Sequence, residues 1–326
     1  MARLLGLGNA LLDIITPLES DGLLGELGLE KGSKQYIAID TLGRALEAVA
    51  DLQPLRAVGG SAANIVRGVS RLGLGAGFVG KVGRDEAGRM IRDEMIGLRI
   101  SPMLHDSVAK TGFSLAFISP DGTRTFATFL GAAATLNAND LNANNFLGYD
   151  ILHIEGYIVQ NRSFLSKVLA LARESRLMVS LDLSNADIVD RNREFLHRII
   201  PQNVDILFTN SESARAFTGK SEKHALFELS SGGRTAVIRM GHHGAMGRRG
   251  EESLHVPCFK ASVVDGTGAS DLFASGCLYG ILNEWPLAKS LELGNYVAHE
   301  VIQSLGTHLS DERWAGIRAR VSQMVG

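Results

Sequence analysis

The sequence predicts an α/β protein with a mostly parallel sheet covered by helices on both faces. From Asp150 onward, short apolar segments typical of strands alternate with longer segments of helical periodicity, as expected when crossover helices join parallel strands. Two glycine-rich blocks, residues 57–92 and 262–280, each place a glycine turn before a helix. With 326 residues, of which 45% are hydrophobic and 21% charged, the chain can bury the core that such a fold needs.

The first predicted strand covers Leu4 to Ile15, stopping at Asn9 and resuming near Asp13. An amide and a carboxylate in so apolar a segment cost free energy unless they find partners. Either they form a satisfied buried pair at a strand end, or they face the hydroxyls of a ligand. A short strand at Gln35–Ile39 and a helix from about Thr41 to Leu52 follow.

The first glycine-rich block predicts a helix that Ser61 caps, directly after Gly59 and Gly60. Apolar residues recur at helical spacing behind it, and Asn64 lies in its first turn. We expect a strand at Gly77–Val82 next, and then a helix from Asp85 to about Ile96.

The segment His105–Leu130 alternates polar and apolar residues around an Asp121-Gly122 turn, which predicts a β-hairpin with one solvated face. It lies between helical segments, so we interpret it as an excursion from the main sheet. Phe113, Leu115 and Phe117 share one face. That apolar face must cover something, and the two alternatives are the binding site of a substrate and the hairpin of a second subunit.

The remaining elements alternate regularly along the chain. Strands are predicted at Ile151–Ile154, Met178–Leu183, Asp205–Thr209 and Thr235–Met240, and helices near Arg162–Ser175, Asp190–Ile200, Ser211–Phe217 and His224–Ser230. In sheets of this kind ligands bind at the carboxyl ends of the strands, where Asn210 and Gly241 lie.

The second glycine-rich block reads as strand, turn and helix, with Val263-Val264 before Asp265–Gly268 and Asp271 in the first helical turn. A first turn has unpaired N–H groups and the positive end of the helix dipole, so it can hold an anion. A carboxylate beside that anion can orient and deprotonate an attacking hydroxyl. The alternative is a tight turn whose aspartate only complements the dipole.

Composition narrows the classes of partner. The net charge is −2, from 33 basic and 35 acidic residues, and predicts neither nucleic-acid nor membrane binding. Cys258 and Cys277 lack metal-ligand spacing, and the nine histidines show no ligand pattern, so we assign no metal-ligating residue. We expect both cysteines to be reduced core residues. The apolar Leu4–Leu12 ends at Asp13 without a cleavage site, and we expect a cytoplasmic protein.

Together the two blocks resemble the motifs of the ribokinase (PfkB) family of carbohydrate and nucleoside kinases. The family's G-G-x-x-x-N and G-x-x-G-x-D-x-x-G patterns match residues 59–64 and 80–88, and its D-T-x-G-A-G-D signature is similar to residues 265–271. The likeness extends from about Leu4 to Gly306. GNALLDI, HIEGY and VDILFTN, which begin at residues 8, 153 and 204, are similar to the adenosine kinase branch.

The resemblance implies one ribokinase-like domain over residues 1–326. Its expected form is a three-layer α/β/α structure with a central, mostly parallel sheet. A small β-sheet lid would be built from inserts near residues 10–40 and 105–130.

The same resemblance implies a kinase that uses ATP and Mg²⁺ to phosphorylate a primary hydroxyl of a small-molecule substrate. A ribonucleoside is the expected acceptor, with adenosine favoured, and the alternative is a furanose sugar, as in ribokinase or fructokinase. A ligand-binding protein without catalysis is the alternative from another class. A homodimer formed through the lid is a further expectation.

Carried over residue by residue, the resemblance makes Asp271 the general base. It makes the backbone of Gly266, Thr267, Gly268, Ala269 and Ser270 the anion hole for the transferred phosphoryl group. The expected acceptor site is formed by Asn9, Asp13, Gly60 and Asn64. The expected nucleotide site is formed by Asn210, Arg239, Gly241 and Asn295.

Two residues have alternative expected roles, and a third has an expected change in pKa. Tyr157 either forms a flat slot for adenine with the strand Gln35–Ile37, or packs in the core. Arg124 either swings toward the phosphates or is an exposed residue of the hairpin tip. The helix N-terminus should lower the pKa of Asp271.

The sequence departs from the family pattern at four positions. Gly266 replaces a threonine, Ser270 replaces the second glycine of G-A-G-D, and Arg239 replaces a small polar residue. In the N-x-x-E motif, Ser213 stands in place of the glutamate, with Glu212 one position early. Ser270 would cost roughly 1 kcal/mol if φ is positive there, and little if the residue is helical. These departures affect metal and nucleotide binding more than the chemistry, and they motivate the non-catalytic alternative.

Overall fold

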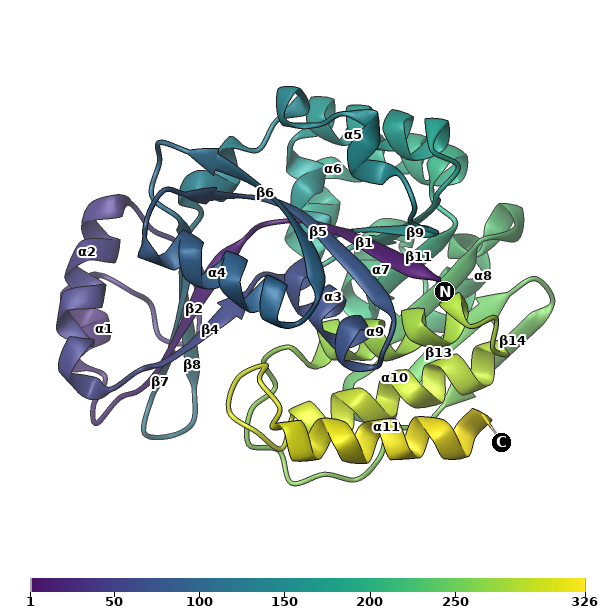
Figure 1. Ribbon diagram of the computed structural model, residues 1–326. Coiled ribbons are helices and arrows are strands. Elements are labelled where there is room, and N and C mark those ends of the chain that lie inside the picture. The colour runs from purple at the N-terminus through teal and green to yellow at the C-terminus, as the bar shows by residue number, and fades with distance from the viewer. Residues whose placement is uncertain (1, 326) are drawn as a thin grey trace.

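The computed structural model describes residues 2–325, and its largest feature is a nine-stranded sheet in the order β14-β13-β12-β11-β10-β9-β1-β5-β6 (Figure 1). The seven strands β12, β11, β10, β9, β1, β5 and β6 pair in parallel with their neighbours in this series. Strand β13 pairs antiparallel with both β12 and β14. The strands of this large sheet are β1 (Arg3–Leu7), β5 (Gly75–Gly83), β6 (Ile100–Ser107), β9 (Ile151–Ile154), β10 (Met178–Asp182), β11 (Ile206–Asn210), β12 (Thr235–Arg239), β13 (Ala245–Arg249) and β14 (Glu252–Val256).

Helices cover both faces of the large sheet. Along β1, Leu5 and Leu7 pack toward α5–α8, whereas Leu4 packs toward α3, α9 and α10. Burial on both faces explains why these strands are apolar without alternation. The helices of these layers are α3 (Ser61–Arg71), α4 (Glu86–Gly97), α5 (Arg162–Glu174), α6 (Ala186–Asn203), α7 (Ser211–Thr218), α8 (Glu222–Leu229), α9 (Ala269–Leu282), α10 (Leu287–Val301) and α11 (Asp311–Val325). The predicted three-layer α/β/α class is confirmed.

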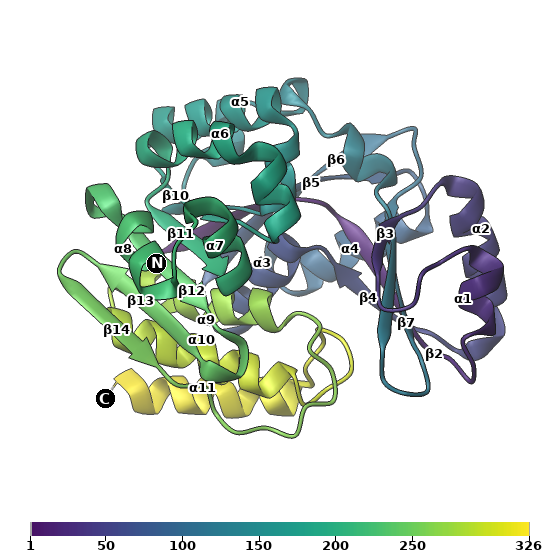
Figure 2. The same cartoon turned by 180° about the vertical axis from the view of Figure 1, so that it is seen from behind.

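A second, small sheet lies at one end of the molecule, at the left in Figure 1 and at the right in Figure 2. Its order is β3-β8-β7-β2-β4. Its strands are β2 (Leu11–Pro17), β3 (Lys34–Tyr36), β4 (Leu55–Gly59), β7 (Gly112–Ile118) and β8 (Arg124–Phe129). The link between β1 and β2 is short, so the two sheets meet at Gly8–Ala10.

Helices α1 (Gly22–Leu27) and α2 (Ile39–Ala48) cover one face of the small sheet. Phe113, Leu115 and Phe117 are buried there with Leu24 and Leu42. The expectation that this apolar face covers the acceptor site or a second subunit is therefore wrong, because helices of the same chain cover it. The opposite face of the small sheet turns toward the large one.

Two predicted elements and one unpredicted strand distinguish the structure from the expectation. Residues 105–107 belong to β6 of the large sheet, so the hairpin begins only at Gly112. The small sheet also includes β4, which the sequence did not predict. Val263 and Val264 form no strand. Both side chains are exposed, and the N–H of Val264 donates to the carbonyl of Ile302 on the neighbouring loop.

Short 3-10 helices occur in the connections: η1 (Ala50–Leu52), η2 (Gly131–Thr135), η3 (Ala138–Asp140), η4 (Ala143–Phe146), η5 (Gly156–Gln160), η6 (Ser231–Gly233) and η7 (Gly241–His243). Cys277 is buried, but Cys258 is half-buried with its thiol on the carbonyl of His242, so only one cysteine is a core residue. Within residues 2–325, no helix is both long and apolar enough to span a bilayer.

Candidate active site

The site forms where the parallel strands of the large sheet end. Asn9 follows β1, Glu155 follows β9, and Asp182, Asn210 and Arg239 are the last residues of β10, β11 and β12. Their strands are neighbours in register, so these polar residues lie along one edge of the sheet. The N-termini of α3 and α9, which pack on each other, reach the same edge.

Asp271 lies in the first turn of α9 and receives two hydrogen bonds from α3. Ser61 Oγ donates to its Oδ1 at 2.7 Å, and Asn64 Nδ2 donates to its Oδ2 at 2.8 Å. Burial raises the pKa of Asp271 to about 6, against the lowering effect of these two hydrogen bonds. The expected lowering of this pKa is wrong because burial outweighs the helix terminus. The carboxyl group is therefore poised as a base near neutral pH.

The backbone ahead of Asp271 is open to an anion. Gly268 has φ 75° and is the N-cap of α9, and within residues 2–325 no acceptor takes the N–H groups of Gly268, Ser270 and Asp271. Unpaired N–H groups at a helix N-terminus are the ordinary phosphate-binding arrangement. Of the predicted anion hole, the N–H groups of Gly268 and Ser270 are thus open to a phosphoryl group, whereas those of Thr267 and Ala269 donate to Asp265 and to the carbonyl of Gly266.

The positions that depart from the family pattern are accommodated. Ser270 is the second residue of α9 and is exposed, so its backbone is helical and needs no glycine. Gly266 is exposed, and a Cβ placed on it would meet open space. Only Gly268 needs glycine here, because φ is positive and an added Cβ would lie 2.4 Å from Thr307 Cγ2.

Gly60 determines how closely two segments approach at the start of α3. It is the N-cap of α3 with φ 99°, and a Cβ on it would lie 2.0 Å from the carbonyl oxygen of Asn9. The prediction that Ser61 caps this helix is wrong by one residue. Ser61 is the first helical residue, and its hydroxyl is used by Asp271 instead.

Asn9 is held by Glu155, which sequence reasoning did not assign to the site. The backbone N–H and side-chain Nδ2 of Asn9 donate to Glu155 Oε1 at 2.8 and 2.5 Å, and the N–H of Ala62 donates to Oε2 at 3.1 Å. Burial raises the pKa of Glu155 to about 7 despite these bonds. A carboxylate directly after a short, mostly apolar strand was the signal available in the sequence.

Asp13 lies in β2 on the face of the small sheet that turns toward the large one. It is only 9% exposed, and burial raises its pKa to about 7. The charge of Arg67 and a hydrogen bond from Ser114 lower this pKa, whereas the charge of Asp271 raises it. Asp13 and Asp271 therefore lie within electrostatic reach of each other, across the space between the two sheets.

Arg124 joins the small sheet to the turn before α9. Its Nη1 donates to Thr267 Oγ1 at 2.8 Å, its Nη2 donates to the carbonyl of Val264 at 3.2 Å, and its guanidinium pairs with Asp265. Asp265 also accepts the N–H groups of Thr267 and Gly306, at 2.5 and 2.7 Å. Arg124 is thus not an exposed tip residue, and it lies against the predicted anion hole.

Tyr157 lies in η5, partly buried against the core beside α5 and α6. Burial raises its pKa to about 12, and the nearby Glu155 and Tyr36 add to this effect. Tyr36 is 59% exposed and belongs to β3, in the strand that the sequence paired with Tyr157. Tyr36 of the small sheet therefore lies within electrostatic reach of Tyr157 in η5.

Of the four residues predicted at the nucleotide, three have side chains engaged with protein groups. Asn210 accepts from the N–H of Ser213 as the N-cap of α7, and donates to the carbonyl of Ser184. Asn295 Nδ2 donates to the carbonyls of Val256 and Pro257 at 3.0 and 3.1 Å. These bonds fix the loop that leads out of β14.

Arg239 forms a buried, two-pronged ion pair with Asp182, at 2.6 and 3.0 Å. It therefore neither projects freely toward a phosphate nor closes the edge of the sheet by itself. Gly241 follows β12 with φ 57°, a conformation that favours glycine. Asp182 was not predicted, and its position at the end of a buried strand was again the available signal.

The side chains of the site could bind Mg²⁺ only together with the phosphate oxygens of a substrate. Within residues 2–325, no group of three or more histidine, cysteine, aspartate or glutamate residues could hold a metal ion. Glu212 is exposed and Ser213 is buried, so the shifted glutamate does not replace the missing one. Mg²⁺ normally keeps several waters and binds through one or two carboxylates and the phosphates of a substrate. The site fits an ion that arrives with a nucleotide.

This arrangement of sheet edge, anion-binding helix terminus and buried aspartate is that of a phosphoryl-transfer enzyme. Residues 36–314 match the profile of the pfkB family of carbohydrate kinases. The chain belongs to this family and is a kinase, as the sequence motifs predicted.

Individual relatives include both sugar and nucleoside kinases. The crystal structure of adenosine kinase from Sinorhizobium meliloti is similar with a TM-score of 0.85 and 29% identity, over 99% of both chains. A probable sugar kinase from Rhizobium etli is similar with a TM-score of 0.87 and 28% identity, again over 99% of both. A 5-dehydro-2-deoxygluconokinase from Listeria monocytogenes is 26% identical over 302 residues, which cover 85% of this chain and 93% of that protein.

Proposed function

We propose that this kinase transfers the γ-phosphoryl group of ATP to a primary hydroxyl of a ribonucleoside, with adenosine as the first candidate. The observation that carries the proposal is Asp271, a carboxyl group with a pKa of about 6 beside the open N–H groups of α9. The base and the anion site lie within one helical turn. The base can therefore hold the acceptor hydroxyl in line with a phosphoryl group that is bound at the anion site.

In the proposed reaction, Asp271 orients the acceptor hydroxyl and accepts its proton. The hydroxyl oxygen forms the new P–O bond, the bond between the β,γ-bridging oxygen and the γ-phosphorus breaks, and ADP leaves. The N–H groups of Gly268 and Ser270 stabilise charge on the transferred group. Mg²⁺, bound with the nucleotide, would neutralise charge on the phosphates.

Acceptor binding is assigned to the space between the two sheets. Asn9 and Asp13 would accept and donate hydrogen bonds to ribose-type hydroxyls, and Asn9 is fixed for this role by Glu155. The small sheet would act as a lid, because Arg124 links it to the loop at Thr267. Closure of such a lid excludes water that would otherwise hydrolyse ATP.

Tyr36 and Tyr157 support a nucleoside over a free sugar. Tyr36 belongs to β3 of the small sheet and Tyr157 to η5, which follows β9 of the large sheet, and a purine that stacked on either ring would gain roughly 1 kcal/mol. A furanose sugar is the second candidate, supported by the sugar kinases among the relatives. The departures at Gly266 and Ser270 give little support to the non-catalytic alternative, because neither position needs the family's residue.

The experiment is a coupled assay of ADP formation with purified protein, ATP and Mg²⁺. We expect ADP in proportion to adenosine, but none with 5′-deoxyadenosine, which keeps the base and lacks the primary hydroxyl. Ribose, fructose and 5-dehydro-2-deoxygluconate test the second candidate in parallel. Turnover with a sugar alone would overturn the nucleoside assignment, and binding without any turnover would favour the non-catalytic alternative.

A further inference from the structure

Arg67 is a buried arginine close to the site, but its hydrogen bonds within residues 2–325 do not include one to Asp271 itself. It lies on α3, one turn after Asn64, and is only 7% exposed. Burial lowers its pKa, while the nearby carboxylates of Glu94 and Asp13 raise it. A buried guanidinium is costly unless its donors are satisfied, so its partners indicate what it does.

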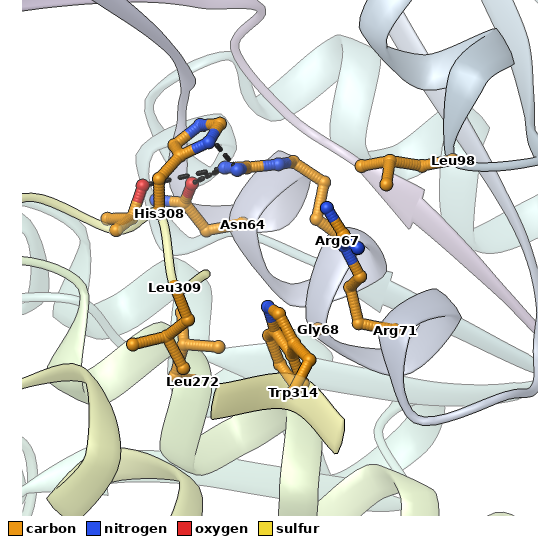
Figure 3. Close-up of a pocket in the computed structure, with 10 residues that line it drawn as sticks. Asn64, Arg67, Gly68, Arg71, Leu98, Leu272, His308, Leu309 and Trp314 are labelled. Atoms are coloured by element: carbon orange, nitrogen blue, oxygen red, sulfur yellow. Dashed lines mark hydrogen bonds between the residues drawn. The ribbon is translucent and has the colours of Figure 1, made fainter. Parts of the chain in front are cut away.

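Three other segments hold Arg67 in place: α4, β4 and the loop at residues 307–308. Its Nε lies 2.8 Å from Glu94 Oε1 on α4, its Nη1 donates to the carbonyl of Val58 at 3.0 Å, and its Nη2 contacts His308 Nε2. Burial and the charge of Arg67 lower the pKa of His308 to about 3, so this imidazole is neutral and can accept the bond. Figure 3 shows the guanidinium directed toward Asn64 and His308.

A further hydrogen bond links Arg67, through Asn64, to the base. Arg67 Nη1 donates to Asn64 Oδ1 at 3.0 Å, and Asn64 Nδ2 donates to Asp271 Oδ2 at 2.8 Å. A side-chain amide has one accepting and one donating end. With its oxygen held by a cation, Asn64 can only present its NH₂ group to the carboxylate.

We propose that Arg67 is a positioning residue for phosphoryl transfer, acting on Asp271 through the side chain of Asn64. The inference rests on the proposed role of Asp271 as the base. Arg67 keeps the Asn64 amide in one orientation. The NH₂ group of this amide in turn donates a hydrogen bond to Oδ2 of Asp271 and fixes the position of that oxygen. The carboxylate is thereby held at the angle from which it meets the acceptor hydroxyl.

Arg67 also acts by charge on Asp13, whose pKa it lowers. A neutral replacement would therefore change two residues of the site at once. Arg67→Lys keeps the positive charge but loses the planar set of donors that contacts Asn64, Val58 and His308 together. This variant therefore tests the hydrogen bonds that run from Arg67 through Asn64 to Asp271, separately from the charge. The matched control is Arg71→Lys, one turn further along α3, where the side chain pairs with Asp311 and makes no contact with Asn64.

The kinetic test is a double-mutant cycle with the best acceptor. We expect Arg67→Lys to lower kcat about 10-fold or more while KM for acceptor and ATP changes little. In an Asn64→Ala background the same change should have almost no further effect, since the intermediary is already missing. Arg71→Lys should leave kcat unchanged. Equal, additive effects in both backgrounds would show a merely structural role and overturn the proposal.

A second readout needs no turnover: the pKa of Asp271 followed by carboxyl-carbon NMR, assigned with Asp271→Asn. Arg67→Lys should raise this pKa by roughly half a unit or more, because a loosened Asn64 stabilises the ionised form less. The charged groups facing Asp271 from other elements, Asp13, Glu155, Asp182 and Arg239, are unchanged in this variant. An unchanged pKa would overturn the positioning role even in an active enzyme. If the wild type transfers phosphate to no acceptor, the proposed function fails. The change in the pKa of Asp271 caused by Arg67→Lys still decides whether Arg67 positions Asp271.

Discussion

Arg124 Nη1 donates to Thr267 Oγ1 at 2.8 Å, a bond between residues 143 positions apart that joins the small sheet to the turn before α9. With the pairing of Arg124 to Asp265, this bond places a positive charge beside the N–H groups that would bind a phosphoryl group. A cation there can neutralise charge that develops during transfer.

We therefore expect Arg124→Ala to lower turnover at least about 10-fold and to raise ATP hydrolysis without acceptor, relative to transfer. ADP and phosphorylated acceptor are to be measured separately in the same reaction. Lys34→Ala is the control, since Lys34 is an exposed cation of the same small sheet. Unchanged turnover and hydrolysis in Arg124→Ala would make the residue a structural link only.

Replacing Asp271 tests the base directly. Asp271→Asn keeps the shape of the side chain and the bond from Ser61, but it cannot accept a proton, so turnover should fall about 100-fold or more. Acceptor binding, measured by calorimetry, should change little. Asp40→Asn, an exposed aspartate in the first turn of α2, is the control. Near-normal turnover in Asp271→Asn would remove this residue from the mechanism.

The pH dependence of kcat/KM should show the titration of the same group. Burial raises the pKa of Asp271 to about 6, and only the ionised form accepts a proton. The rate should therefore fall as pH decreases below about 6, by about 10-fold per unit at low pH. If the rate stays level down to about pH 5, Asp271 does not titrate as the structure indicates.

The sequence predicted most of the large sheet because its strands are buried on both faces. Short, mostly apolar segments between helical patterns, such as Ile151–Ile154, indicate buried strands, and the bounds of this one agree with β9. The failures are elements whose structure depends on distant partners. β4 has two exposed residues and pairs with β2, some 40 residues away, so no local pattern marked it. Val263-Val264 is β-branched, but it has no neighbouring strand to pair with.

In the site, motif spacing located Asp271, Asn64 and Gly60, but not the partners that orient them. The contacts of Glu155 with Asn9 and of Asp182 with Arg239 join residues 146 and 57 positions apart along the chain. Arg67 contacts Asn64 on the same helix, where its position in the sequence looks like ordinary packing. The pKa of Asp271 was mispredicted for the same reason. A helix terminus can be identified in sequence, whereas burial by the surrounding segments cannot.

Asp13 should link stability to pH. Burial raises its pKa from 3.8 to about 7 in the folded protein. The folded state thus binds more protons than the unfolded chain within this window, and the free energy of unfolding falls as pH rises through it. Asp13→Asn removes this dependence, so the variant should gain on the order of 1 kcal/mol or more over the wild type between about pH 4.5 and pH 8. Urea unfolding at both pH values measures the change. A constant difference between the two proteins would contradict a raised pKa.

Ser270 should be replaceable by the family's glycine without benefit. It lies in the first turn of α9 with an exposed side chain. Ser270→Gly should lower stability by roughly 0.5 kcal/mol and leave kcat and KM for ATP within about twofold, because the N–H group that faces the phosphate is kept. Thermal unfolding and initial rates check the two statements. A large gain in activity would show that serine obstructs the anion site.

Gly60 is the glycine at which a single methyl group should cost most. Its φ of 99° costs an L-residue roughly 1–2 kcal/mol, and an added Cβ would lie 2.0 Å from the carbonyl oxygen of Asn9, which is backbone and cannot rotate away. Gly60→Ala should therefore destabilise the protein by at least about 2 kcal/mol and displace Asn9, raising KM for the acceptor more than KM for ATP. Gly43→Ala is the matched control. Gly43 is an exposed glycine inside α2 with open space at its Cβ, so the same methyl group should stabilise by roughly 0.5–1 kcal/mol. Equal, small effects of the two substitutions on unfolding and on acceptor KM would show that the approach of Gly60 to Asn9 is not required.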